Sequence, residues 1–166
     1  VCCVSKICSG EILIKLYFKN GSFNMTDENH WPINLIPIIE EFKDCFDSMD
    51  RYELLFDYAK KHPTPLSPEN WTDSNQIVGC QSRAHVECIL DDNGNFLMKG
   101  GADAQIVQGL MAITAMAVNG LSPKEVSILS PEYANEMGIQ SSLTPSRANG
   151  FLNMFRRVQE EAIKLL

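Results

Sequence analysis

The sequence lacks three features that would each point to a particular partner. Its 21 acidic residues outnumber its 14 lysines and arginines, giving a net charge of −7, whereas nucleic-acid binding requires a basic surface. Its longest apolar run, residues 110–118, reaches about half of the roughly 20 residues of a membrane-spanning helix. The Gly100-Gly101 pair fits neither of the glycine-rich nucleotide-binding motifs. We therefore expect no nucleic acid, membrane or nucleotide partner.

The sequence also lacks the cysteine spacing of a disulfide framework or of a metal site. Three of the six cysteines crowd the N-terminus, whereas Cys45, Cys80 and Cys88 fall in unrelated parts of the pattern. No C-x2-C pair occurs together with a second pair or with two histidines, as a zinc site requires. We therefore expect no bound metal, and free thiols in a reducing compartment.

The hydrophobic content of 45% over 166 residues is enough for one domain with a core. Residues 1–33 show no clear amphipathic period and are predicted to be a partly ordered N-terminal arm or a targeting remnant. Residues 34–166 are predicted to form the domain. We expect a two-layer α+β fold in the order α-α-β-β-β-α-α-α-α, with a small three-stranded antiparallel sheet packed against helices.

Hydrophobic periodicity and capping signals predict the positions of these elements. A stripe that includes Cys45 predicts a first helix from Pro37 to Met49, and Asp50 with Glu53 predicts the start of a second. Strands are expected over 76–78, 83–91 and from 96 to 98, with Asp92-Asn93-Gly94 as a hairpin turn. The four later helices are expected to start near Asp103 as N-cap, Ser122, Ser130 and Thr144.

Cys80 is the candidate functional atom of the chain. The period-2 pattern over 83–91 places Cys88 on the core face of a strand and His85 on the opposite, solvated face. Cys80 precedes this pattern and follows Gly79, which can adopt backbone angles closed to other residues, so we expect it at the tip of a loop. The bland alternative for Cys80 is a small buried hydrophobic residue.

Three motifs that are separated in the chain carry a family resemblance. They are Gly79-Cys80-Gln81-Ser82, then Ala102-Asp103-Ala104 with Ile106-Val107 and Gly109-Leu110, then Leu143-Thr144-Pro145-Ser146-Arg147 with Asn149-Gly150. In combination and order they resemble the SufE family, from about Phe42 to the C-terminus, and residues 129–166 are most similar to plastid members. The sequence departs from the family at His85, where many relatives carry tryptophan, and at Gly101, which is often acidic.

The resemblance implies a SufE/NifU-like fold and a sulfur acceptor. Cys80 would take persulfide sulfur from a SufS-like cysteine desulfurase, stimulate that enzyme and pass the sulfur to a SufBCD-like iron–sulfur scaffold. The chain itself would bind no cofactor, because pyridoxal phosphate belongs to the desulfurase. Asp103 and Arg147, together with Gln81 beside the cysteine, would border Cys80 or the partner surface.

The resemblance also favours a plastid-type organelle, plastid or apicoplast, over a bacterial cytoplasm or a mitochondrion. It is compatible with a monomer or a homodimer.

Two other functions stay open. A thiol enzyme would use Cys80 as nucleophile and His85 as base, because the other two histidines lie in the arm and at a helix end. A cluster scaffold would need several thiolate ligands around one site, and an inward-facing Cys88 leaves too few. More ordinary roles for the flanking residues are a helix cap for Asp103 and an exposed first-turn arginine for Arg147.

Overall fold

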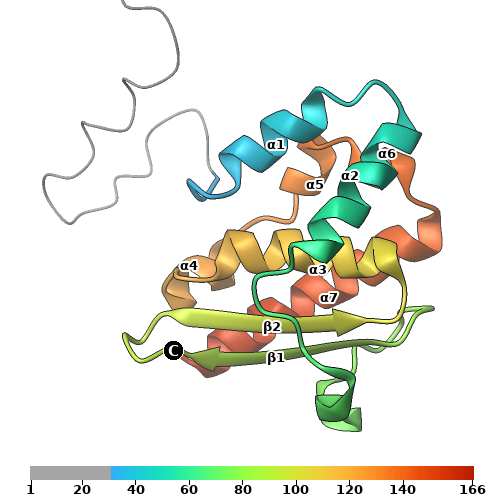
Figure 1. Ribbon diagram of the computed structural model, residues 1–166. Helices are drawn as coiled ribbons and strands as arrows, with labels where there is room; N and C mark the ends of the chain where they lie inside the picture. Colours follow the sequence, from blue (N-terminus) through green and yellow to red (C-terminus); the bar gives the residue numbers. More distant parts are fainter. Residues whose placement is uncertain (1–30) are drawn as a thin grey trace, which may run out of the picture. The chain divides into compact units, whose positions relative to one another are not determined.

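The computed structural model of the chain describes residues 31–166 (Figure 1). Two strands, β1 (Ala84–Leu90) and β2 (Phe96–Ala102), form an antiparallel hairpin whose register pairs Ala84 with Ala102 and Leu90 with Phe96. The predicted turn connects them, with Gly94 at a φ of 80°. The helices are α1 (Ile36–Lys43), α2 (Ser48–Lys60), α3 (Gln105–Val118), α4 (Pro123–Ile128), α5 (Tyr133–Glu136), α6 (Ile139–Ser142) and α7 (Pro145–Lys164), and two 3-10 turns, η1 (Pro68–Asn70) and η2 (Asp73–Asn75), precede the sheet.

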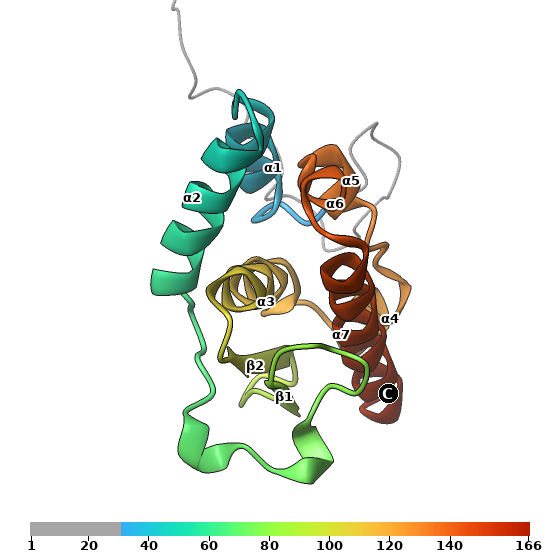
Figure 2. The same ribbon diagram turned by 90° about the vertical axis from the view of Figure 1, so that its right-hand side faces the viewer.

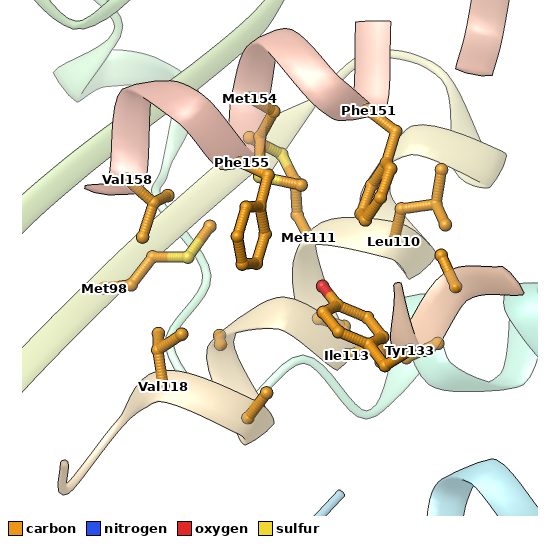
Figure 3. Packing of buried hydrophobic residues seen from close by; sticks show 14 of the residues in the cluster. Met98, Leu110, Met111, Ile113, Val118, Tyr133, Phe151, Met154, Phe155 and Val158 are labelled. Atoms are coloured by element: carbon orange, nitrogen blue, oxygen red, sulfur yellow. The ribbon is translucent and has the colours of Figure 1, made fainter. Parts of the chain in front are cut away.

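Helix α3 lies at the centre of the domain, with the sheet on one side and α2 and α7 flanking it (Figure 2). It is predominantly apolar and mostly buried, which is the pattern of a helix covered on all sides. Met111 and Ile113 of α3 meet Phe151 and Phe155 of α7 in a cluster that also surrounds the ring of Tyr133 (Figure 3). This core fixes α7, the helix that later reaches the candidate site. No helix in residues 31–166 has the length and apolarity needed to cross a membrane.

The prediction of a three-stranded sheet is wrong for the described residues, which contain a two-stranded one. The segment expected as the first strand makes only a single antiparallel bridge, between Gln76 and His85. The chain cannot continue along β1 because Gly79, at a φ of 81°, turns it away from the sheet. The expected strand is therefore the first side of a loop.

The predicted first helix is also shorter than expected. Helix α1 ends at Lys43, and Asp47 caps α2 by accepting hydrogen bonds from the backbone N–H groups of Met49 and Asp50. Cys45 therefore lies in the connection, half exposed, rather than in a buried stripe, and Phe46 is 98% exposed. The N-cap of α2 lies three residues before the predicted one, so the prediction of two helices is correct, but the first was extended through the connection and into the start of α2.

A strap formed by residues 61–76 runs beside the free edge of β2, where Pro65 makes a parallel bridge to Gly100, and its 3-10 turns lie on the side of the sheet away from α3 (Figure 2). Leu66 N–H donates to Gly100 O at 2.8 Å, and Gly100 N–H donates to Thr64 O at 3.2 Å. The strap can come this close because Gly101 has no β-carbon; one at this position would lie only 2.4 Å from Leu66 O. The Gly100-Gly101 pair, which fits no nucleotide motif, is thus explained by packing.

The later elements match the predictions more closely. Helices α4 and α7 start after the predicted residues, with Ser122 and Thr144 as N-caps. Ser122 and Glu125 form a capping box, and α7 buries an apolar stripe from Phe151 to Ala162. Ser130 precedes α5, but α6 was not predicted. Of the arm expected over 1–33, residues 1–30 lie outside the described part of the chain, whereas Trp31 packs edge-on against Tyr133 and donates to Glu136 Oε1 at 2.9 Å.

Candidate functional site

Cys80 lies in a short loop, residues 78–83, that is closed at its base by the start of β1. Ile77 is buried, and its N–H donates to Ala84 O at 2.8 Å. The neighbouring Val78 is 86% exposed and Gln81 is also exposed. The loop is thus anchored at its two ends and presented to solvent between them, as predicted for Cys80.

The thiol of Cys80 does not point freely into solvent. The residue is half buried and packs against the edge of the hydrophobic core. Helix α7 comes against it at Gly150, where a β-carbon would lie only 3.1 Å from Cys80 Sγ. Ser82 Oγ lies 3.1 Å from the same sulfur, within hydrogen-bonding distance. The position of the Cys80 side chain is therefore set by Gly150, the apolar edge of the core and the hydroxyl group of Ser82, and we call this position its seat.

A second residue of α7 holds the backbone of the loop. Asn153 Nδ2 donates to Gly79 O at 3.4 Å, and a β-carbon at Gly79 would lie 2.6 Å from that nitrogen. Gly79 also has a positive φ of 81°, which side-chain-bearing residues rarely adopt. The turn therefore requires glycine before the cysteine, and Asn153 packs closely against it.

His85 is not the solvated strand residue that the alternating pattern predicts, because it is only 4% exposed. Its ring stacks on Trp71 of the strap, with centroids 4.8 Å apart, and Nδ1 is 2.9 Å from Asn75 Oδ1. In this arrangement its hydrogen-bonding partner is Asn75, while Cys80 Sγ is bonded to Ser82. The geometry therefore gives the Cys80–His85 dyad no support.

The other predicted site residues lie around the loop in different roles. Asp103 does not cap α3, whose N-cap is Ala104; its Oδ1 instead accepts the N–H of Arg83 at 3.0 Å and closes the open end of the hairpin. Arg83 in turn places its guanidinium 5.5 Å from the centre of the Trp71 ring. Arg147 is exposed in the first turn of α7, one helical turn before Gly150. Asp103 and Arg147 thus flank the loop at its base and along α7.

The remaining described cysteines lie in settings unlike that of Cys80. Cys88 is on β1, and burial raises the pKa of its thiol to about 12, with Glu161 adding to the effect. Cys45 lies beside carboxylates of α1 and α2, and desolvation also raises the pKa of its thiol. Within residues 31–166 no group of three or more His, Cys, Asp or Glu side chains is arranged to hold a metal ion. A scaffold-type cluster site is accordingly unsupported in this part of the chain.

Sequence reasoning missed Ser82, Gly150 and Asn153 as neighbours of Cys80. Ser82 and Gly150 both lie inside the motifs that carried the family resemblance, so their positions were marked but their contacts were not. Asn153 lies in the segment most similar to plastid members, but its contact had no signal, because it joins residues 74 positions apart in sequence. Trp71, the stacking partner of His85, lies between the second predicted helix and the first predicted strand, outside every predicted element.

The fold and site define a class: an α+β domain that presents one partly exposed thiol on a short anchored loop. Residues 37–162 match the family model described as SufE: Fe-S metabolism associated domain. The chain therefore belongs to the SufE family, which is associated with iron–sulfur metabolism.

Relatives from several lineages agree with this assignment. The chain is 42% identical over 132 residues to an uncharacterized SufE-like protein of the cyanobacterium Synechocystis sp., covering 80% of this chain and 82% of that protein. It is 32% identical over 134 residues to SufE-like protein 1, chloroplastic/mitochondrial, of Arabidopsis thaliana, covering 81% of this chain but 36% of the longer plant protein. The fold is also that of a hypothetical protein from Thermus thermophilus solved in solution, with a TM-score of 0.68, 23% identity and coverage of 81% and 97% of the two chains.

Proposed function

We propose that this protein takes persulfide sulfur onto Cys80 from a pyridoxal-phosphate-dependent, SufS-like cysteine desulfurase, stimulates that enzyme, and passes the sulfur to a SufBCD-like iron–sulfur scaffold. The observation that carries the proposal is the position of Cys80, a partly exposed thiol on an anchored loop within the Gly-Cys-Gln-Ser motif. Membership in a family associated with iron–sulfur metabolism supports it. The pyridoxal phosphate belongs to the desulfurase, and this chain supplies only the acceptor thiol.

The transfer needs an acceptor sulfur that is deprotonated and can reach a donor persulfide. A loop between exposed Val78 and exposed Gln81 satisfies the requirement for access. The closed base of the loop, at the Ile77–Ala84 hydrogen bond, keeps the presented segment short and defined. These features suit a thiol that is delivered into the active site of another protein.

Docking to the desulfurase is proposed to draw the Cys80 side chain out of its seat. In the free protein Sγ rests against Gly150 and the edge of the core, where contact with bulk oxidants is limited. Leaving this seat releases the contact with Gly150 and the edge of the core, whereas Ser82, two residues along the same loop, moves with the cysteine and keeps its contact with Sγ. This gating fails if free and desulfurase-bound Cys80 are alkylated at the same rate.

Arg147, Gln81 and Asp103 are proposed to serve the contact with the partner rather than the chemistry. Exposed Arg147 and Gln81 would contact the desulfurase surface, where a guanidinium suits an acidic patch. Asp103 would act through the backbone, because its carboxylate holds Arg83 at the base of the loop. Loss of Arg147 should therefore weaken binding, whereas sulfur already bound on Cys80 should transfer onward at an unchanged rate.

The test is to incubate the protein with a SufS-like desulfurase, pyridoxal phosphate and cysteine. Intact mass and peptide mass spectrometry should find one additional sulfur atom on Cys80, removable by reductant, together with faster alanine release by the desulfurase. Cys80→Ser should lose both effects, and Cys88→Ser, in the same strand-loop unit, should keep both. Sulfur acceptance at an unchanged level by Cys80→Ser would overturn the proposal.

The proposed location is a plastid-type organelle, plastid or apicoplast. The cyanobacterial relative and the plant relative named chloroplastic/mitochondrial support it, with a bacterial cytoplasm or a mitochondrion as the alternatives. A fluorescent fusion to the natural protein, expressed in a plastid-bearing cell beside plastid and mitochondrial markers, distinguishes the plastid from the mitochondrion and from a diffuse signal.

A further inference from the structure

The hydroxyl of Ser82 is the single hydrogen-bonding partner of Cys80 Sγ found within residues 31–166. The two atoms are 3.1 Å apart, and both side chains are half buried. On its other side the sulfur meets Gly150, which has no side chain, and the apolar edge of the core. Any charge that develops on Sγ is therefore met within the described chain by this one hydroxyl.

The direction of the Ser82–Cys80 hydrogen bond depends on the charge of the sulfur. While Cys80 is a thiol, either group can donate, but a thiolate can only accept, so Ser82 must then be the donor. A hydrogen bond to an ionised acceptor is roughly twice as strong as one between neutral groups. The contact consequently places a hydrogen-bond donor where negative charge develops on Cys80 Sγ.

We propose that Ser82 is a catalytic residue of this site, acting as the donor that stabilises negative charge on Cys80 Sγ. This inference rests on the proposed function, and it goes beyond it by naming the group that controls the reactivity of the acceptor. The role is distinct from that of Asn153, which bonds the loop backbone at Gly79 and not the sulfur.

Acceptance and delivery of sulfur both involve negative charge on Cys80 Sγ. In acceptance, the Cys80 thiolate attacks the outer sulfur of the donor persulfide; the new S–S bond forms on Sγ, the donor S–S bond breaks, and the donor cysteine leaves as its thiolate. In delivery, the thiolate of the next acceptor attacks the outer sulfur on Cys80, and Sγ leaves with the electron pair of the broken S–S bond. Neither step changes the total number of disulfide-type bonds, so no external oxidant or reductant is required.

Ser82 should matter more for delivery than for acceptance. In acceptance it raises the fraction of thiolate but lowers the intrinsic nucleophilicity of that thiolate, and these effects partly cancel. In delivery the same hydrogen bond forms as the charge develops on the leaving sulfur, and a better-stabilised thiolate leaves faster. The rates of acceptance and of delivery therefore test the role of the Ser82 hydroxyl separately.

The experiment compares the natural protein with Ser82→Ala and with Ser82→Thr, which keeps a hydroxyl. The rate of Cys80 alkylation by iodoacetamide is followed against pH by peptide mass spectrometry, with Cys45 as the internal reference. For delivery, Cys80 is loaded with inorganic polysulfide and its persulfide is discharged to a small thiol. Neither assay uses a desulfurase, so a failure of Ser82 and a failure of the proposed function are told apart.

For Ser82→Ala we expect discharge of the Cys80 persulfide to slow several-fold, and to slow more than alkylation of the free Cys80 thiol, because negative charge develops on Sγ as it leaves. Ser82→Thr should restore both rates, while Cys45 stays unchanged. A residue that merely shaped the loop would slow both reactions alike. Ser82→Ala rates equal to the natural ones at every pH, or Ser82→Thr rates as slow as those of alanine, would overturn the inference.

Discussion

Gly150 of α7 lies against the side chain of Cys80, so that a β-carbon at position 150 would stand 3.1 Å from Sγ. This distance is shorter than ordinary van der Waals contact, and the flexible partner is the cysteine rather than the helix. The helix glycine therefore makes room for the thiol in its seat. Two residues from distant parts of the sequence together set how far the sulfur is withdrawn from solvent.

Gly150→Ala should push Cys80 outward. The added methyl group occupies part of the seat, and Cys80 can rotate away, so we expect iodoacetamide to label Cys80 several-fold faster in the unpartnered protein. The stability should change by no more than about 1 kcal/mol, because alanine favours the helix while the displaced contact is small. Alkylation rates are measured by peptide mass spectrometry, with Asn149→Ala, an exposed neighbour on α7, as the control. An unchanged rate in Gly150→Ala would mean that the seat does not limit access.

Gly109→Ala tests a helix glycine whose close neighbour is a backbone atom rather than a movable side chain. A β-carbon there would lie 2.3 Å from Leu55 O, a backbone atom of α2 that cannot rotate away. Helices α2 and α3 would have to separate, so we expect a loss of about 2 kcal/mol or more in the free energy of unfolding. Urea unfolding measures it.

Gly150→Ala is the matched comparison for Gly109→Ala, because the same change on a helix there meets a movable side chain. We therefore expect a large loss in the free energy of unfolding for Gly109→Ala and a small one for Gly150→Ala. Equal losses at the two positions would show that the close backbone contact between α2 and α3 is not what constrains residue 109.

Elements whose signals are local were predictable from the sequence. The Asp92-Asn93-Gly94 turn, the Ser122 capping box and the apolar stripe of α7 each depend on residues within a few positions of one another. The position of Cys80 on a loop before β1 followed in the same way, from Gly79 and the start of the alternating pattern.

What could not be predicted depends on contacts between distant segments. His85 alternates like a solvent-facing residue, but the strap brings Trp71 over it and buries it. The segment before Gly79 has strand-like residues, yet its backbone finds only one bridge because Asn153 of α7 holds the turn. The seat of Cys80 was hidden for the same reason, since Gly150 reaches it from the last helix. Periodicity reports which face is apolar and not which segment will cover the other face.

Cys88 should be unreactive under conditions in which Cys80 reacts. Burial raises the pKa of the Cys88 thiol to about 12, so about one molecule in ten thousand carries its thiolate near pH 8. We expect iodoacetamide to modify Cys80 in the folded protein and Cys88 only after unfolding in urea. Labelling of Cys88 in the native protein as fast as Cys80 would contradict this, and the sulfur-loading assay would then need Cys88→Ser throughout.

His62 should make the protein less stable as the pH falls below neutrality. Its side chain is 9% exposed, Nδ1 accepts the N–H of Thr64 at 3.2 Å, and Nε2 is buried without a partner among the described residues. Burial lowers the pKa of His62 from 6.5 to about 4. Between these two values the unfolded chain binds a proton that the folded protein does not. Lowering the pH through this window therefore favours unfolding, and above it the effect vanishes.

The size of the His62 effect follows from the two pKa values: from about pH 7.5 to about pH 5, this group should remove up to about 2 kcal/mol from the free energy of unfolding. His62→Asn keeps an acceptor for Thr64 but cannot be protonated, so it should show a correspondingly smaller loss over the same interval, whatever its stability at neutral pH. Urea unfolding of both proteins at the two pH values measures the difference. Equal losses in the two proteins would mean that His62 is protonated within the folded domain. The strap beside Gly100 would then have to move so that the charged ring is solvated.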